Sequence, residues 1–240
     1  MKKIIVYVLV IAIFVGIGFG VKRFIEGPSQ PVNGILVMGT DQDINKVKHM
    51  YKDNAKQTSD YKLKLVTTTI KTELSEQDQK EEPRQQFDIR HINYSVITRS
   101  TAEQFIKKGM IRQRKDPNSV SIISDPVTTI KELSTGQNLL FSFSDEELKN
   151  NQLDLNGQMI PAQYVKHQAW IGYKPAMYLV IVDDQTYSKL AEAETTISLI
   201  PFQKRSFDYK NKVKMNEVIS EIEIVYPGSE AKVNFVNVQE

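Results

Sequence analysis

One segment of the chain, Asp41-Gln-Asp43-Ile-Asn45, has the acidic spacing that opens an EF-hand calcium loop. Such a loop also needs Gly at its sixth position for a sharp turn and Glu at its twelfth position to bind the ion through two oxygens. Those positions hold Lys46 and Lys52, whose positive charges would repel Ca²⁺. We therefore interpret the acids as the first turn of a helix rather than as a metal site.

The other residue types that could do chemistry show no catalytic spacing. His49, His91 and His167 are far apart and have no His or Glu at metal-binding distance along a helix. Asp183-Asp184 follows an apolar run, where a helix cap is favoured over a metal or acid pair. The absence of Cys excludes a thiol nucleophile, a Cys-bound zinc, a disulfide scaffold and a cysteine-linked lipid anchor. We expect no cofactor, no metal and no enzymatic activity.

Five residues are candidates for contact with a partner or with lipid headgroups. Arg112, Arg114 and Lys115 form a compact basic patch, which is either a solvated turn or a contact for anionic envelope polymer or headgroups. Trp170 and Tyr173, within Ala-Trp-Ile-Gly-Tyr, are either core anchors or aromatic residues of a binding surface.

The chain from Ile4 to Val21 is an uncharged apolar run of 18 residues, which as a helix would extend about 27 Å, close to the thickness of a bilayer core. It is long for a signal peptide, so we predict an uncleaved single-pass anchor in membrane lipid, with a cleaved signal as the alternative. The very short leading tail favours a cytoplasmic N-terminus and an extracytoplasmic C-terminal part at the plasma membrane.

The charge balance changes when the anchor is set aside. The whole chain has 31 Lys+Arg and 29 Asp+Glu, and four of the basic residues flank the apolar run. Residues 24–240 therefore carry 27 basic and 29 acidic residues, a net charge of −2. This balance argues against a nucleic-acid partner.

Residues 24–33 form a Pro-containing linker, and we predict an α+β fold after it, with mixed strands and helices in two subdomains, 34–111 and 112–240. Apolar and β-branched runs predict strands. The expected strands are 34–39, 63–70, 87–98 with a bulge, 120–123, 138–143, 177–182, 196–202, 218–226 and 231–238.

Capping residues predict the helix starts. Thr40 or Asp41 opens a helix to residue 55, and the capping boxes 100–103 and 144–147 each open a helix. Asp125-Pro126 starts a further helix, and Asp183 or Asp184 caps one over 185–194. Asn156-Gly157 predicts a hairpin.

The stretch from Asn138 to Leu190 resembles the extracellular domain of FtsX-like ABC transporter permeases of the bacitracin-export type. The resemblance rests on the Asn156-Gly157 hairpin, the apolar strand after it, and the spacing of Asp184, Tyr187 and Leu190. It implies contact with antimicrobial peptides or lipid-linked wall precursors. The chain departs from a permease in having one predicted span and no ATPase.

These features predict a membrane-anchored extracytoplasmic domain that binds rather than catalyses, acting with other membrane proteins of a transporter or envelope complex. Confinement at the membrane raises the effective concentration of such a domain for membrane partners. The alternatives are a membrane-anchored envelope enzyme and a structural subunit of a surface or secretion assembly.

Overall fold

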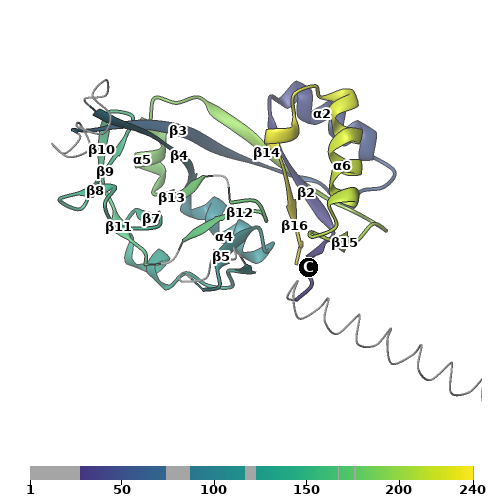
Figure 1. Ribbon diagram of the computed structural model, residues 1–240, viewed down its shortest axis with the longest axis horizontal. Coiled ribbons are helices and arrows are strands. Elements are labelled where there is room, and N and C mark those ends of the chain that lie inside the picture. Colours follow the sequence, from purple (N-terminus) through teal and green to yellow (C-terminus); the bar gives the residue numbers. More distant parts are fainter. Residues whose placement is uncertain (1–27, 74–86, 117–122, 167, 176, 240) are drawn as a thin grey trace, which may run out of the picture.

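The computed structural model describes residues 28–73, 87–116, 123–166, 168–175 and 177–239, which form two lobes (Figure 1). The predicted membrane segment from Ile4 to Val21 lies outside the described residues, as does most of the strand predicted at 120–123. Within the described ranges, no helix is both long enough and apolar enough to cross a membrane.

An eight-stranded mixed sheet runs through both lobes in the order β11-β7-β13-β4-β3-β14-β2-β16. The pairs β13–β4 and β11–β7 are parallel, and the other neighbours are antiparallel. The coarse prediction of an α+β class is confirmed. The strands are β2 (Gly34–Gly39), β3 (Ser59–Glu73), β4 (Phe87–Thr98), β7 (Leu139–Phe141), β11 (Gln163–Tyr164), β13 (Tyr178–Val182), β14 (Glu194–Pro201) and β16 (Val233–Val236).

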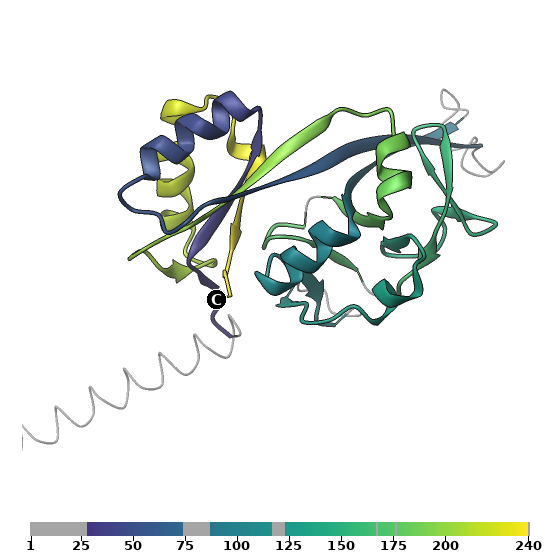
Figure 2. The same ribbon diagram turned by 180° about the vertical axis from the view of Figure 1, so that it is seen from behind.

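Strand β3 belongs to both lobes. Its residues 59–64 pair with β14, and its residues 64–73 pair with β4. Figures 1 and 2 show β3 and β14 running side by side from one lobe to the other. The lobes are therefore joined by a hydrogen-bonded sheet rather than by a flexible linker.

The proximal lobe, which contains β2, β16 and the end of β14, carries two helices on one face of the sheet. Helix α2 (Asp41–Tyr51) is capped by Thr40 and buries Ile44, Val47 and Tyr51, at the spacing of one helix face. The elements that complete this lobe are α6 (Lys212–Val225), the short helix η2 (Glu230–Lys232), and β1 (Pro31–Val32) paired with β15 (Phe207–Asp208).

In the distal lobe, smaller elements pack against both faces of the large sheet. One face carries α4 (Arg99–Lys107) and the small sheet β12-β5-β6, and the opposite face carries α5 (Asp184–Lys189) and the small sheet β10-β9-β8. The remaining elements here are β5 (Ile111–Arg114), β6 (Ser124–Pro126), η1 (Lys131–Thr135), β8 (Leu148–Lys149), β9 (Gln152–Leu155), β10 (Gln158–Pro161) and β12 (Ala169–Ile171).

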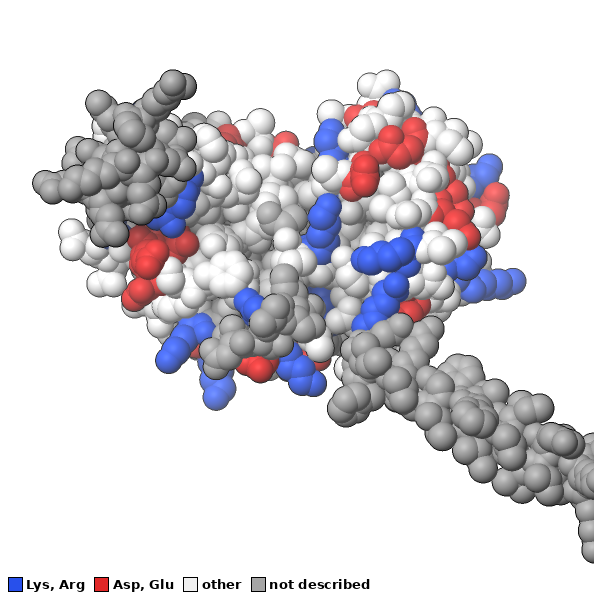
Figure 3. Space-filling view, viewed as in Figure 1, with Lys and Arg blue, Asp and Glu red and all other residues white. Residues whose placement is uncertain are grey.

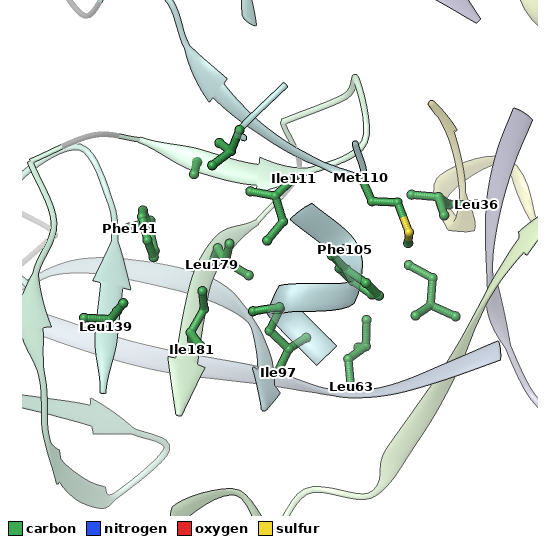
Figure 4. Packing of buried hydrophobic residues seen from close by; sticks show 14 of the residues in the cluster. Leu36, Leu63, Ile97, Phe105, Met110, Ile111, Leu139, Phe141, Leu179 and Ile181 are labelled. Carbon is green, nitrogen blue, oxygen red and sulfur yellow. The ribbon is translucent and has the colours of Figure 1, made fainter. Parts of the chain in front are cut away.

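The core of the distal lobe forms because both faces of its central strands are apolar. In β4, Val96 packs toward the small sheet of β8–β10, while Ile97 packs toward α4. Figure 4 shows Phe105 of α4 among Ile97, Leu63 and Leu179. Strands buried on both faces appear as continuous apolar runs, as in residues 178–182.

Most predicted strands and the hairpin at Asn156-Gly157 are confirmed, but several local predictions are wrong. The predicted strand at 218–226 is part of α6, because Val218 and Ile222 lie one turn apart and are both buried against the proximal sheet. Tertiary burial here overrides the β-preference of Val and Ile. Strand β4 pairs with β3 in unbroken register and has no bulge.

Two predicted helix starts do not form helices. Asp125-Pro126 lies in β6, and only a 3-10 turn, η1, follows. The box at 144–147 forms bends that lead into β8. The box at 100–103 lies inside α4, whose cap is Thr98, accepting from the N–H of Thr101. The helix after Asp183 ends at Lys189, earlier than predicted.

The segment 171–174 of the distal lobe is hydrogen-bonded to β16 of the proximal lobe. The side-chain amide of Asn234 donates to the carbonyls of Ile171 at 2.8 Å and Lys174 at 3.1 Å, and its oxygen accepts from the N–H of Lys174 at 2.9 Å. Gly172 has φ +77°, and a Cβ there would lie 2.5 Å from Asn234. The two lobes thus meet at a position that requires Gly on one side and an amide on the other.

We predict that Asn234→Ala lowers the free energy of unfolding by about 1–3 kcal/mol, since it leaves backbone groups of residues 171 and 174 without their partner. Equilibrium urea unfolding of the purified chain measures this. Asn216→Ala, on the exposed face of α6, serves as the control and should change stability by less than about 0.5 kcal/mol. Equal stability of the two variants would contradict the assigned role of Asn234.

Candidate functional site: a polar cleft in the distal lobe

The distal lobe contains an open cleft with a volume of about 810 Å³. The cleft lies at the edge of the large sheet, where β7, β11 and the end of β13 meet the turn between β8 and β9. Its lining is dominated by amide and carboxylate side chains. The lining residues are Gly136, Gln137, Asn138, Asp145, Leu148, Asn150, Asn151, Pro161, Ala162, Gln163, Tyr164 and Asp183.

Strand pairing brings the floor of the cleft together. β13 runs antiparallel to β7, with Ile181 opposite Leu139, and the residue that follows β13 is hydrogen-bonded to the residue that precedes β7. These residues are Asp183 and Asn138. β11 runs parallel to β7, with Gln163 opposite Leu139, and so adds its own residues beside them.

Asn138 fixes this floor and is only 5% exposed. Its Nδ2 donates to the carbonyl of Pro161 at 2.9 Å, and its Oδ1 accepts from the N–H of Asp183 at 3.1 Å. Its own carbonyl accepts from the N–H of Gln163 at 2.8 Å. Asn138 therefore joins the ends of β10 and β13 through its side-chain amide and the start of β11 through its backbone carbonyl.

Asp183 is held as the N-cap of α5, as the sequence predicts. Its carboxylate accepts from the backbone N–H of Thr186 at 2.8 Å and from the hydroxyl of Thr186 at 2.9 Å. The backbone N–H bond is the main cause that holds the pKa of Asp183 below its ordinary value. A carboxyl that is ionised and committed to a cap is poorly suited to act as a general acid.

The rim of the cleft offers hydrogen-bonding groups with no hydrogen bond to the described part of the protein. These side chains are exposed: Gln137, Asp145, Asn150, Asn151 and Gln163. Asn150 and Asn151 have φ values of 54° and 59°, in the left-handed region that Asn tolerates better than most residues. The carbonyl of Asn151 accepts from the N–H of Ala162 at 3.0 Å, which anchors this turn to the floor.

Tyr164 provides a half-buried aromatic ring beside the amides, and its hydroxyl donates to the carbonyl of Phe143 at 3.3 Å. Burial, with smaller contributions from Asp145 and Glu147, raises the pKa of Tyr164. The cleft lining includes no Lys, Arg or His, and no group of three His, Asp or Glu able to hold a metal ion occurs among the described residues. The exposed amides of the cleft can both donate hydrogen bonds to a polar ligand and accept them from it.

The structure does not bring the five predicted contact residues into this cleft, and three of them are buried. Arg112, Trp170 and Tyr173 are 4%, 2% and 4% exposed. The guanidinium of Arg112 lies 4.0 Å from the ring centroid of Tyr173 and bonds to the hydroxyl and carbonyl oxygens of Ser124. The hydroxyl of Tyr173 donates to the carbonyl of Pro31 at 2.7 Å.

Arg114 and Lys115 lie nearer the surface. The Arg114 guanidinium lies 5.6 Å from the Phe143 ring, and Lys115 forms an exposed ion pair of 3.8 Å with Asp125. Contact of the five residues with a partner or with headgroups stays a prediction. The internal interactions of Arg112 and Tyr173 account for their residue types without such contact, whereas the buried indole N–H of Trp170 has no hydrogen-bond partner among the described residues.

The other residues singled out from the sequence are dispersed. Asp43 bonds to Thr40 and Lys46, and Asp41 bonds to Thr196 and Lys62, so both acids act at the start of α2. The pKa of Asp43 is lowered mainly by the hydrogen bond from the Thr40 hydroxyl. The pKa of Asp41 is lowered mainly by the hydrogen bond from the Thr196 hydroxyl. His49 and His91 are exposed and on different elements, and His167 lies outside the described residues.

The fold and the cleft define an α+β protein with a polar cleft, and comparison with known proteins gives its family. A model described as an uncharacterised lipoprotein family matches residues 32–239, so the chain belongs to this lipoprotein family. Comparison with curated proteins gave no match.

A solved structure from Bacillus anthracis, described as a candidate lipoprotein, has a TM-score of 0.54 and 19% sequence identity to the chain. The similarity covers 86% of this chain and 99% of that one. At this identity the likeness shows a shared fold alone.

The resemblance to FtsX-like transporter permeases is therefore wrong, because the family model that covers residues 32–239 is the lipoprotein one. The features behind the resemblance are local. Asn156-Gly157 forms the tight turn between β9 and β10, and Asp183 caps α5. Such turns and caps occur in many unrelated folds and do not identify one.

Sequence reasoning did not single out the rim of the cleft. Asn150-Asn151 was the available signal, because adjacent Asn residues between short apolar runs are typical of left-handed turns. Nothing in the sequence indicates that this turn lies opposite Gln137 and Tyr164, since those contacts depend on the strand order.

We predict that Asn138→Ala lowers the free energy of unfolding by about 1–3 kcal/mol, because the backbone groups of residues 161 and 183 lose a buried partner. Urea unfolding measures the change. The neighbouring exposed variant Gln137→Ala is the control and should have nearly wild-type stability. If both variants unfold at the wild-type urea concentration, Asn138 does not organise the cleft.

We predict that Asp183 makes stability depend on pH. Its folded pKa lies below the unfolded value of about 3.9. The stabilisation of the folded state by Asp183 is therefore complete above the unfolded pKa and is lost as pH falls through the folded pKa. Asp183→Asn, which keeps a capping oxygen, should be less stable than wild type at neutral pH and equal to it in strong acid. Unfolding at a series of pH values tests this, with Asp184→Asn as the control for loss of one charge at the same helix end.

Proposed function

We propose that this protein is an extracytoplasmic binding domain held at the membrane by residues 4–21, and that the cleft of the distal lobe binds an uncharged, hydroxyl- or amide-bearing ligand such as an oligosaccharide. The domain acts by binding rather than by catalysis. It works at the membrane surface beside other membrane proteins of the cell envelope.

The observation that carries the proposal is the composition of the cleft. Exposed amides and one exposed carboxylate surround a half-buried Tyr ring, over a floor fixed by Asn138 and Asp183. Amides both donate and accept hydrogen bonds, and hydroxyl groups do the same, so the two match. The two acids and the absence of basic side chains among the described lining residues disfavour an anionic ligand.

Membrane attachment is supported by the family and by the sequence together. The family is one of lipoproteins, and the 240 residues contain no Cys that could carry a cysteine-linked lipid. The apolar run from Ile4 to Val21 supplies a peptide anchor instead. The proposal places the N-terminus in the cytoplasm and the folded domain outside.

Ligand binding is tested by calorimetry on the full chain in detergent, with chitotetraose as the uncharged probe and tetragalacturonate as a charged oligosaccharide of equal length. We expect binding of the first and not of the second. Asn150→Gly combined with Asn151→Gly should weaken binding about tenfold or more, because both amides are lost while Gly accepts the left-handed backbone.

Asn156→Gly is the matched control, since Asn156 also has a positive φ of 54° but lies outside the cleft lining. It should bind the probe as the wild type does. Equal affinity of the cleft double variant and the wild type would exclude the cleft as the binding site. Cleavage of chitotetraose by the purified chain would instead support the alternative of an envelope enzyme.

Attachment is tested by fractionating cells that express the full chain or a variant lacking residues 4–21. The full chain should stay in the membrane pellet after an alkaline wash and be digested by protease added to intact protoplasts. The deletion variant should be released from the pellet. Protection of the full chain from external protease would overturn the extracytoplasmic placement.

A further inference from the structure

A basic segment of the proximal lobe lies directly beside the first described residues of the chain. Residues 203–214 read QKRSFDYKNKVK and contain five basic residues and one acid, whereas residues 24–240 together have a net charge of −2. β15, within this segment, pairs with β1 through Pro31↔Asp208 and Val32↔Phe207. Nζ of Lys210 donates to the carbonyl of Pro28 at 2.6 Å.

This position ties the basic segment to the membrane. Six residues separate Val21, the last residue of the predicted anchor, from Pro28. Even a fully extended chain of that length reaches about 24 Å. The basic segment therefore lies near the bilayer surface whenever the anchor is inserted.

Two of the five basic residues are neutralised within the lobe. Arg205 forms an ion pair of 2.8 Å with Glu221, and Lys214 forms one of 2.8 Å with Glu217. Lys204 and Lys212 are exposed, and no ion pair with a described residue involves them. Figure 3 shows basic side chains gathered over the part of the lobe where Figure 1 places β15.

An exposed apolar side chain lies among these lysines. Val213, at the start of α6, is 68% exposed and has Lys212 and Lys214 as its chain neighbours. An apolar residue flanked by lysines suits the boundary between headgroups and acyl chains, because the long lysine side chains can keep their charges at the headgroup level. This feature distinguishes the segment from an ordinary solvated basic turn.

We propose that residues 203–214 form a second membrane contact, which binds the anionic phospholipid headgroups of the bilayer that holds residues 4–21. This inference rests on the membrane attachment in the proposed function. Lys204 and Lys212 supply the attraction to the headgroups, and Val213 enters the boundary region. The contact holds the proximal lobe against the bilayer and limits the orientations that the domain can take.

The test uses the full chain in vesicles of phosphatidylcholine, alone or mixed with phosphatidylglycerol, with a nitroxide-headgroup lipid as quencher. Because the chain has no Cys, an introduced Cys places a fluorophore at a single position. Ser206→Cys reports on the basic segment, and Gln185→Cys in α5 is the matched reporter on the distal lobe.

We expect stronger quenching at position 206 in the anionic vesicles and no such difference at position 185. Lys204→Gln with Lys212→Gln should weaken the contact about fivefold for each lysine lost, and high salt should act in the same direction. Lys149→Gln with Lys189→Gln, a pair of exposed lysines on the distal lobe, should leave quenching at position 206 unchanged.

Equal quenching at position 206 in both kinds of vesicle, or no effect of the Lys204 and Lys212 pair, overturns the proposed contact. Flotation of the protein with the vesicles is measured in the same samples and reports on the anchor alone. Flotation without lipid-dependent quenching would support the proposed attachment and contradict the second contact. Failure of the protein to float with either kind of vesicle would contradict both the attachment and the second contact.

Discussion

The structure depends on the dual pairing of β3. The first residues of this strand bond to β14, and its later residues bond to β4, so one strand contributes to the sheet of both lobes. The backbone hydrogen bonds of β3 fix the register of each neighbour, and a shift by one residue would turn every side chain to the opposite face. Residues such as Leu63 and Val66, which point to opposite cores, make that shift costly.

The cleft follows from the same sheet. β4 pairs with β13, β13 pairs with β7, and β7 pairs with β11, so the register that begins at β3 places Asp183 beside Asn138 and brings Tyr164 of β11 to the same edge of the sheet. The buried amide of Asn138 then converts strand proximity into a fixed floor. The rim is built differently, from a turn whose two Asn residues adopt left-handed backbone conformations. A rigid floor under an exposed amide rim suits binding with little rearrangement of the protein.

Charge is distributed between the lobes in a way that matches the separate roles proposed for them. The described lining of the distal-lobe cleft contains neutral amides and two acids. The basic segment of the proximal lobe lies beside β1. The Arg205–Glu221 pair, which also includes a hydrogen bond from Tyr51 to Glu221, ties that segment to α2 and α6. The basic segment is thus held by the folded lobe rather than by its own conformation.

The sequence alone predicted the features that depend on neighbouring residues. The cap residue Thr40 or Asp41 predicted the start of α2, Asn156-Gly157 predicted a hairpin, and Asp183 or Asp184 predicted a helix cap. The apolar run from Ile4 to Val21 and the absence of Cys are also properties of the sequence itself. These predictions hold because a turn, a cap or an amphipathic face is decided by interactions within a few residues.

Tertiary structure decided what depends on distant residues. Val218 and Ile222 lie in a helix because the proximal sheet, built from strands at both ends of the chain, buries them one turn apart. Trp170 and Arg112 are buried because β12 pairs with β5, which their local sequence does not encode. The cleft likewise exists only once β7, β11 and β13 are adjacent. Such pairings join residues far apart in the chain, and no short-range preference specifies them.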